Sequence, residues 1–150
     1  MGLETVIVVK SMESNIQTYK DIKTQSDAVL HFLQHLDIEM IDSVLEPNRT
    51  YQDFEKNTFV QKLGYALDEF IQLGDTYLNR FPGQCNSEIC NYKCKGFTFI
   101  GNNSSNYFDL IIDIKEGVVQ DIYECTQFQT FCILNSKQIP IEIDKWKPQF

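Results

Sequence analysis

Three cysteines lie close together in a polar stretch of the chain, at Cys85, Cys90 and Cys94. Thiolate sulfurs bind zinc and other thiophilic metals, and a structural zinc ion needs four ligands in tetrahedral geometry. Cys125 is not expected to supply the fourth, because in a simple meander of strands it would lie roughly 20 Å away. The spacing also differs from that of paired Cys-x-x-Cys zinc motifs. A structural zinc clip at this loop is therefore a hypothesis, set against free thiols or an adventitious disulfide, and no other cofactor is indicated.

Two histidines, His31 and His35, are four residues apart in a segment with helical periodicity. This spacing places two imidazoles on one face of a helix, where both can bind one metal ion. At about 100° per residue, however, they lie nearly opposite the apolar Val29 and Leu33. We therefore expect solvated surface histidines rather than metal ligands.

The composition is that of an acidic globular domain. The 150 residues include 13 basic and 21 acidic side chains, a net charge of −8, and 43% are hydrophobic. This charge disfavours binding to nucleic acid phosphates or to anionic membranes. The apolar run at residues 6–9 is too short for a signal peptide or a membrane span, so we expect a cytoplasmic protein with reduced thiols. No linker or repeat divides the chain, and residues 1–150 are expected to form one domain.

Three amphipathic helices are expected before residue 75. The first covers residues 26–36, and the second follows Asp37, which can cap its N-terminus, and ends before Pro47. The third covers residues 55–73, where apolar side chains gather on one side, and Gly74 has the position of a C-terminal cap. A short extended piece is expected between the second and third helices.

The remaining chain has the periodicity of β-strands. Residues 76–81 are expected to be extended, and residues 96–101, 107–115 and 118–128 are rich in β-branched and aromatic side chains separated by turn sequences. The last three are predicted to be consecutive antiparallel strands. Helices followed by such strands predict an α+β fold, with N-terminal helices packed on a curved antiparallel sheet.

This order of elements resembles the nuclear transport factor 2-like superfamily, whose cystatin-like cone fold is shared by ketosteroid isomerases and polyketide cyclases. The resemblance covers residues 26–128, including the sequence EGVV at residues 116–119, and leaves residues 1–25 and 129–150 as extensions. It implies a pocket for small apolar molecules between the concave face of the sheet and the helices. It also implies a homodimer, since many members pair through the outer face of the sheet. Here that face would carry Tyr107, Asp109, Ile111 and Asp113.

The residues that face the interior follow from alternation along the strands. In the strand at residues 107–115, the more hydrophobic face is expected to line the interior. It carries Phe108, Leu110, Ile112 and Ile114. The register of the next strand is open by one residue, since the turn at residues 115–117 can be a two-residue loop or a type I turn with a glycine bulge. The inward residues are then either Val119, Asp121, Tyr123 and Cys125 or Val118, Gln120, Ile122 and Glu124.

Either register turns a carboxylate toward the interior, Asp121 beside Tyr123 in one case and Glu124 in the other. A buried carboxyl group has a raised pKa, which suits proton abstraction. The favoured alternative is that these groups lie at the rim of the pocket or on the solvated face. The chain has no Gly-x-Ser-x-Gly elbow and no glycine-rich phosphate or dinucleotide loop, so no catalytic residue is assigned.

Two functions are therefore set against each other. The first is the binding of a small apolar ligand in an interior pocket. Its expected lining residues are Phe108, Leu110, Ile112, Asp121, Tyr123 and Glu124. The second is a non-enzymatic interaction module, because eleven phenylalanines can fill the interior at ordinary packing density. Outside the expected core, residues 5–9 and 139–143 are β-prone, and they can pair with each other or extend the edge of the sheet.

Overall fold

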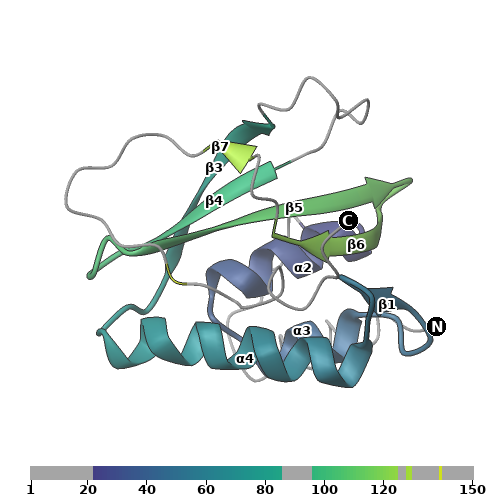
Figure 1. The fold of residues 1–150 in the computed structure, drawn as a ribbon, viewed down its shortest axis with the longest axis horizontal. Helices are drawn as coiled ribbons and strands as arrows, with labels where there is room; N and C mark the ends of the chain where they lie inside the picture. The colour runs from purple at the N-terminus through teal and green to yellow at the C-terminus, as the bar shows by residue number, and fades with distance from the viewer. Residues whose placement is uncertain (1–21, 86–95, 125–127, 130–138, 140–150) are drawn as a thin grey trace.

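The computed structural model describes residues 22–85, 96–124, 128–129 and 139. Their helices pack on one face of an antiparallel sheet, and a small hairpin lies beside strand β6 (Figure 1). This arrangement is the α+β class predicted from the sequence. None of the described helices has the length and apolar character needed to cross a bilayer.

Helices α2 and α3 begin at side chains that cap them. Helix α2 (Gln25–Gln34) has a capping box, in which the Thr24 hydroxyl accepts the Asp27 N–H and the Asp27 carboxylate accepts the Thr24 N–H. Helix α3 (Ile38–Val44) is capped by the carboxylate of Asp37, as predicted. The first two expected helices are therefore confirmed, within two residues at each end.

The link between α3 and α4 is a hairpin of two short strands, β1 (Thr50–Tyr51) and β2 (Phe54–Glu55). Its turn residues, Gln52 and Asp53, both have left-handed backbone conformations, with φ values of 52° and 66°. Tyr51 is fully buried, so its side chain anchors the hairpin in the core.

Helix α4 (Lys56–Gln72) is the longest described helix, and one stripe of its surface is buried. The stripe consists of Phe59, Leu63, Ala66, Leu67 and Phe70. Gly74 follows with a φ of 91°, and its N–H donates to the Ile71 carbonyl at 3.0 Å. Glycine adopts this left-handed conformation without steric strain, so the chain leaves the helix here, as the sequence predicted.

The main sheet is antiparallel and has the strand order β6-β5-β4-β3-β7. Its strands are β3 (Leu78–Cys85), β4 (Gly96–Gly101), β5 (Tyr107–Lys115), β6 (Val118–Tyr123) and β7 (Phe128–Gln129). The expected single strand at residues 118–128 is therefore wrong beyond Tyr123, because Phe128 pairs with Cys85 at the opposite edge. Five Cα steps span at most about 18 Å, whereas four strand spacings in a flat sheet amount to about 19 Å. The sheet must therefore curve to bring β6 and β7 within this reach.

The hairpin between β5 and β6 closes through a two-residue turn, one of the two geometries considered from the sequence. Glu116 and Gly117 have φ values of 53° and 78°, which is a type I′ turn. The pairing of β6 with β5 then slips by one residue at Gln120, which forms a β-bulge.

Because of this bulge, Val119 and Ile122 both face the helices and are fully buried. Each of the two registers considered is thus half right, since Val119 belongs to the first and Ile122 to the second. The side-chain amide of Gln25 holds the bulge in place. Its Oε1 accepts the Val119 N–H at 2.7 Å, and its Nε2 donates to the Val44 carbonyl at 3.0 Å.

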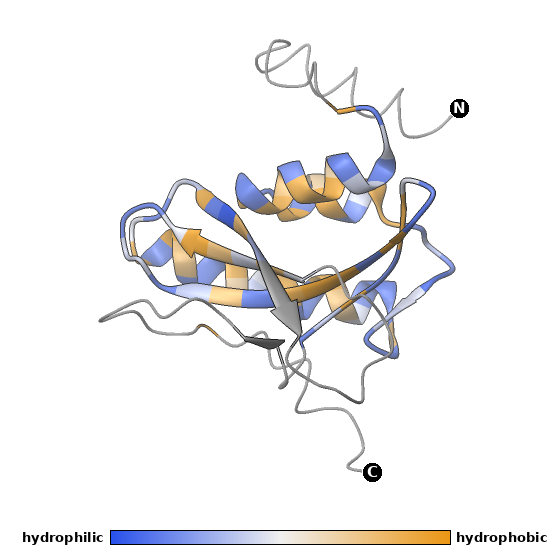
Figure 2. Cartoon of the chain, turned by 90° about the horizontal axis from the view of Figure 1, so that it is seen from above, coloured by the Kyte–Doolittle hydropathy of each residue, from blue (hydrophilic) through white to orange (hydrophobic). Residues whose placement is uncertain are grey.

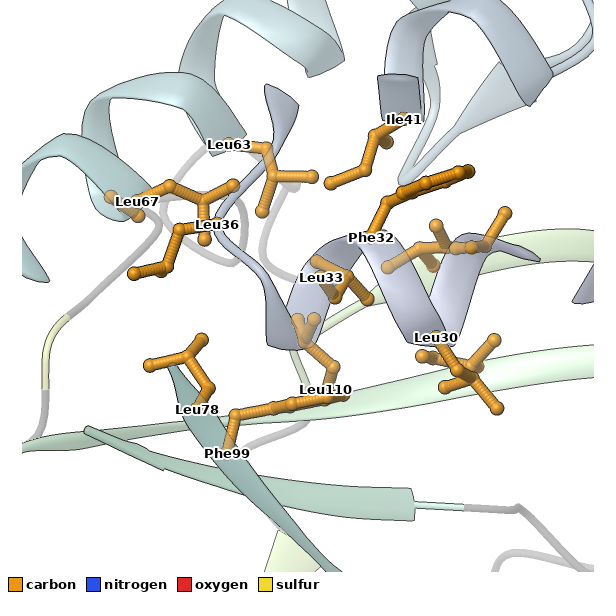
Figure 3. Packing of buried hydrophobic residues seen from close by; sticks show 14 of the residues in the cluster. Leu30, Phe32, Leu33, Leu36, Ile41, Leu63, Leu67, Leu78, Phe99 and Leu110 are labelled. Carbon is orange, nitrogen blue, oxygen red and sulfur yellow. The ribbon is translucent and has the colours of Figure 1, made fainter. Parts of the chain in front are cut away.

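The core fills the space between the helices and the sheet. Each helix carries both hydrophobic and hydrophilic residues (Figure 2), and the hydrophobic ones gather on the sheet side. In Figure 3, Leu33 of α2 lies between Leu63 of α4 and Leu110 of β5. Gln25 and Ile139 are buried although they lie outside the expected core range of residues 26–128.

A buried carboxylate holds the turn between β4 and β5. Asp75, which is 3% exposed, accepts the N–H groups of Asn103 and Ser104 through Oδ1, both at 2.7 Å. Its Oδ2 accepts the Ser104 hydroxyl at 2.6 Å. The carboxylate lies directly over Gly101, where a Cβ atom would overlap it. The link after α4 and the β4–β5 turn are therefore tied together at a point where only glycine fits.

Candidate functional site

The inward side chains of β5 lie where alternation predicted, but they border no open space. Phe108, Leu110 and Ile112 have no exposed surface. The Phe108 ring makes edge-to-face contacts with Phe70, at 5.3 Å between centroids, and with Phe99, at 5.4 Å. A side chain without exposed surface borders no gap that holds a water molecule. Ligand binding here stays a prediction that requires the packed side chains to move.

Two other expected lining residues lie on the opposite face of the sheet. Asp121 is paired with Asp113, and Tyr123 is paired with Ile111. Directly opposite residues of antiparallel strands point to the same side, so all four belong to the face without helices, hereafter the helix-free face. The Asp121 carboxylate accepts the Gln52 N–H at 2.7 Å. Asp121 therefore ties the β1–β2 hairpin to β6, and the structure does not bring it together with the inner-face residues.

The helix-free face has a buried centre that the sequence reasoning missed. Thr98 of β4 is fully buried, and Asp109, opposite it on β5, is 6% exposed. The Thr98 hydroxyl donates to Asp109 Oδ1 at 2.6 Å. Ile111 is 1% exposed and lies outside the hydrophobic cluster formed with the helices. From the sequence, Asp109 was expected on the outer face, but its burial and its partner were not visible.

The environment of Asp109 changes its acidity. Burial raises the pKa of Asp109 to about 6, with the Thr98 hydrogen bond lowering it and the Glu124 carboxylate adding to the rise within that value. Glu124, the last of the expected lining residues, therefore acts electrostatically on the helix-free face. Asp109 forms no ion pair with any residue in the described part of the chain. The site can take up a proton near neutral pH, which is the property required of an acid or base group.

The two histidines lie side by side near the end of α2. Their rings are 4.4 Å apart, and the His35 ring makes an edge contact with Tyr77. His35 is exposed as predicted, whereas His31 is half-buried. Burial and the nearby His35 lower the pKa of His31 to about 4, with Asp37 acting in the opposite direction. Across the described ranges, no group of three His, Cys, Asp or Glu side chains is placed to hold a metal ion.

Replacing Asp109 by asparagine should stabilise the folded chain at high pH, because the ionised Asp109 carboxylate destabilises it there. The folded-state pKa of about 6 lies above the ordinary value of 3.8, so the folded chain binds this proton more tightly than the unfolded chain. The stability due to this group is complete below pH 3.8 and is lost as the pH rises through 6. At pH 8, the free energy of unfolding of Asp109→Asn should exceed that of the parent by about 1–2 kcal/mol. One pKa unit corresponds to about 1.36 kcal/mol, and solvent screening lowers the energy obtained from the whole shift. Urea unfolding from pH 4 to pH 8 measures this difference.

The matched control is Asp113→Asn, an exposed carboxyl on the same strand, which should change the free energy of unfolding at pH 8 by less than about 0.5 kcal/mol. His31 changes the stability in the opposite direction with pH. Because its pKa is lowered, its contribution to the free energy of unfolding is lost as the pH falls from 6.5 to about 4. Parent and variant are therefore compared at each pH. Parallel pH profiles for the parent and Asp109→Asn would contradict the assignment.

The expected zinc site falls outside the described residues. Cys90, Cys94 and Cys125 are not among them, and Cys85 is described only as part of the β3 backbone, where it pairs with Phe128. Zinc binding by Cys85, Cys90 and Cys94 thus stays a prediction.

No protein-family model, no curated protein sequence and no solved structure matches this chain.

Proposed function

We propose that this chain is a non-enzymatic interaction module that forms a homodimer through the helix-free face of its sheet. The observation that carries the proposal is the filled inner face, where Phe108, Leu110 and Ile112 have no exposed surface. Helices cover that side of the sheet (Figure 1), whereas Phe81 on the other side is 43% exposed. An interior ligand would have to displace packed aromatic rings, whereas a partner that contacts the exposed Phe81 would not.

Two exposed side chains lie on the helix-free face together with its buried centre. Phe81 of β3 lies opposite Thr98 and is 43% exposed, and Asp113 of β5 is exposed. Large aromatic side chains contribute strongly at protein interfaces, where they enter well-packed and desolvated sites. We therefore expect Phe81 to be a main contact of the dimer.

The order of elements supports the same proposal through the superfamily resemblance. Two helices, a short hairpin beside β6, a long helix and a run of antiparallel strands follow one another. This is the order on which the resemblance to the nuclear transport factor 2-like superfamily rests, and pairing through the outer sheet face is common there. We propose membership in that superfamily together with the dimer.

Sedimentation velocity of the full chain tests the dimer. The measurement is made at about 0.15 M salt, where charge repulsion beyond about 8 Å is screened. The parent should sediment as a dimer at about 100 µM, and Phe81→Asp should weaken the association at least about tenfold, because it places a charge in a desolvated contact. Tyr65→Asp is the control, since Tyr65 is 67% exposed on α4, on the helical side. A monomeric parent, or equal effects of the two substitutions, would overturn the proposal.

A further inference from the structure

Strand β5 has an edge that β6 leaves open. Strand β6 pairs with β5 only from Ile111 to Lys115, so the first part of β5 extends past the end of β6 (Figure 1). The Asn106 carbonyl accepts the Gly101 N–H at 2.8 Å and therefore points toward β4. Successive residues of a strand point their N–H and C=O groups to alternate sides. The backbone groups of Tyr107 and Asp109 therefore point away from β4, along the open edge.

One residue from far along the chain occupies this edge. The Ile139 N–H donates to the Tyr107 carbonyl at 2.6 Å. The Ile139 side chain is 1% exposed and belongs to the hydrophobic core. A backbone hydrogen bond to an open strand edge, combined with an apolar side chain inserted beside it, is the pattern of recognition by strand addition.

We propose that the edge of β5 at Tyr107, Phe108, Asp109 and Leu110 is a docking site for an extended apolar segment, and that the segment carrying Ile139 occupies it in the same chain. The site recognises a backbone N–H at the Tyr107 carbonyl and a branched aliphatic side chain that enters the core. It differs from the helix-free face of the proposed dimer, because it is the edge of one strand rather than the surface of the sheet.

The sequence after Ile139 is compatible with such docking. The next residue is Pro140, which has no backbone N–H. In an extended segment whose Ile139 N–H points at β5, the next backbone nitrogen points away from β5. A proline there costs no hydrogen bond with β5, and it prevents a further strand from pairing on the outer side.

Hydrogen exchange of individual backbone amides in full-length Ile139→Asp tests the site. A charge cannot enter the core, so the edge should open. The edge-facing amides of Tyr107 and Asp109 should exchange about tenfold faster than in the parent, whereas those of Phe108 and Leu110, which point toward β4, should not. Ile139→Val keeps the branched shape and should leave all four amides unchanged. If Ile139→Asp does not fold, Ile139→Ala takes its place.

A peptide spanning residues 136–143 provides the second measurement. Added at about 1 mM, near the effective concentration of a tethered segment, it should restore slow exchange at Tyr107 and Asp109 of Ile139→Asp. The same peptide with aspartate in place of the isoleucine should not. Protection in the parent should be independent of protein concentration, since docking occurs within one chain. Equal acceleration of all four amides, no rescue by the peptide, or protection that requires a second copy would each overturn the proposal.

Discussion

Alanine in place of Gly101 is expected to lower the free energy of unfolding by about 3–5 kcal/mol, the sum of an overpacking cost and of hydrogen bonds lost by a buried carboxylate. A Cβ atom at this position would overlap the Asp75 carboxylate, which is 3% exposed. That carboxylate accepts two backbone N–H groups and the hydroxyl of Ser104. Moving it takes these hydrogen bonds away from a buried carboxylate. Urea unfolding at neutral pH measures the change.

Gly64→Ala is the matched control, because it makes the same chemical change with the opposite expected sign. Gly64 lies inside α4, and a Cβ atom there would meet Ile38 Cγ1 at 3.4 Å, an ordinary contact. Alanine should stabilise the helix by about 0.5–1 kcal/mol relative to glycine. Similar small effects at both positions would contradict the tight contact between Gly101 and Asp75.

Phe108→Ala is expected to lower the free energy of unfolding by about 3–5 kcal/mol, the range for truncating a buried aromatic side chain. The Phe108 ring has no exposed surface and contacts the rings of Phe70 and Phe99 edge to face. Its removal leaves a cavity between α4 and the sheet and takes away both ring contacts. Chemical denaturation followed by circular dichroism measures the loss.

Phe81→Ala is the control, because it makes the same phenylalanine-to-alanine change at an exposed position. Phe81 is 43% exposed, and its truncation should cost less than about 1 kcal/mol at a concentration where the chain is monomeric. If Phe108→Ala cost as little, the Phe108 ring would border an open space. The interior ligand pocket would then be the better explanation, and the interaction module would lose its main support.

The local elements of this fold could be predicted because their causes are local. Asp37 caps α3 and Gly74 ends α4 through hydrogen bonds to backbone groups within four residues. The alternation of β5 placed Phe108, Leu110 and Ile112 on the core face for the same reason, since neighbouring side chains of a strand point to opposite sides. The candidate site was predicted only in part. Asp109 was assigned to the outer face, but its burial depends on the structure around it.

The α+β class, the positions of the helices and the face of β5 that enters the core all follow from the amino-acid sequence. The bulge at Gln120 depends on tertiary contacts, because the Gln25 amide that holds it comes from α2. The pairing of Phe128 with β3 and the contact of Asp109 with Thr98 also depend on such contacts. One cause explains all three. A slip of one residue changes little in local backbone preference, so contacts between distant segments select the register and set the environment of each carboxylate.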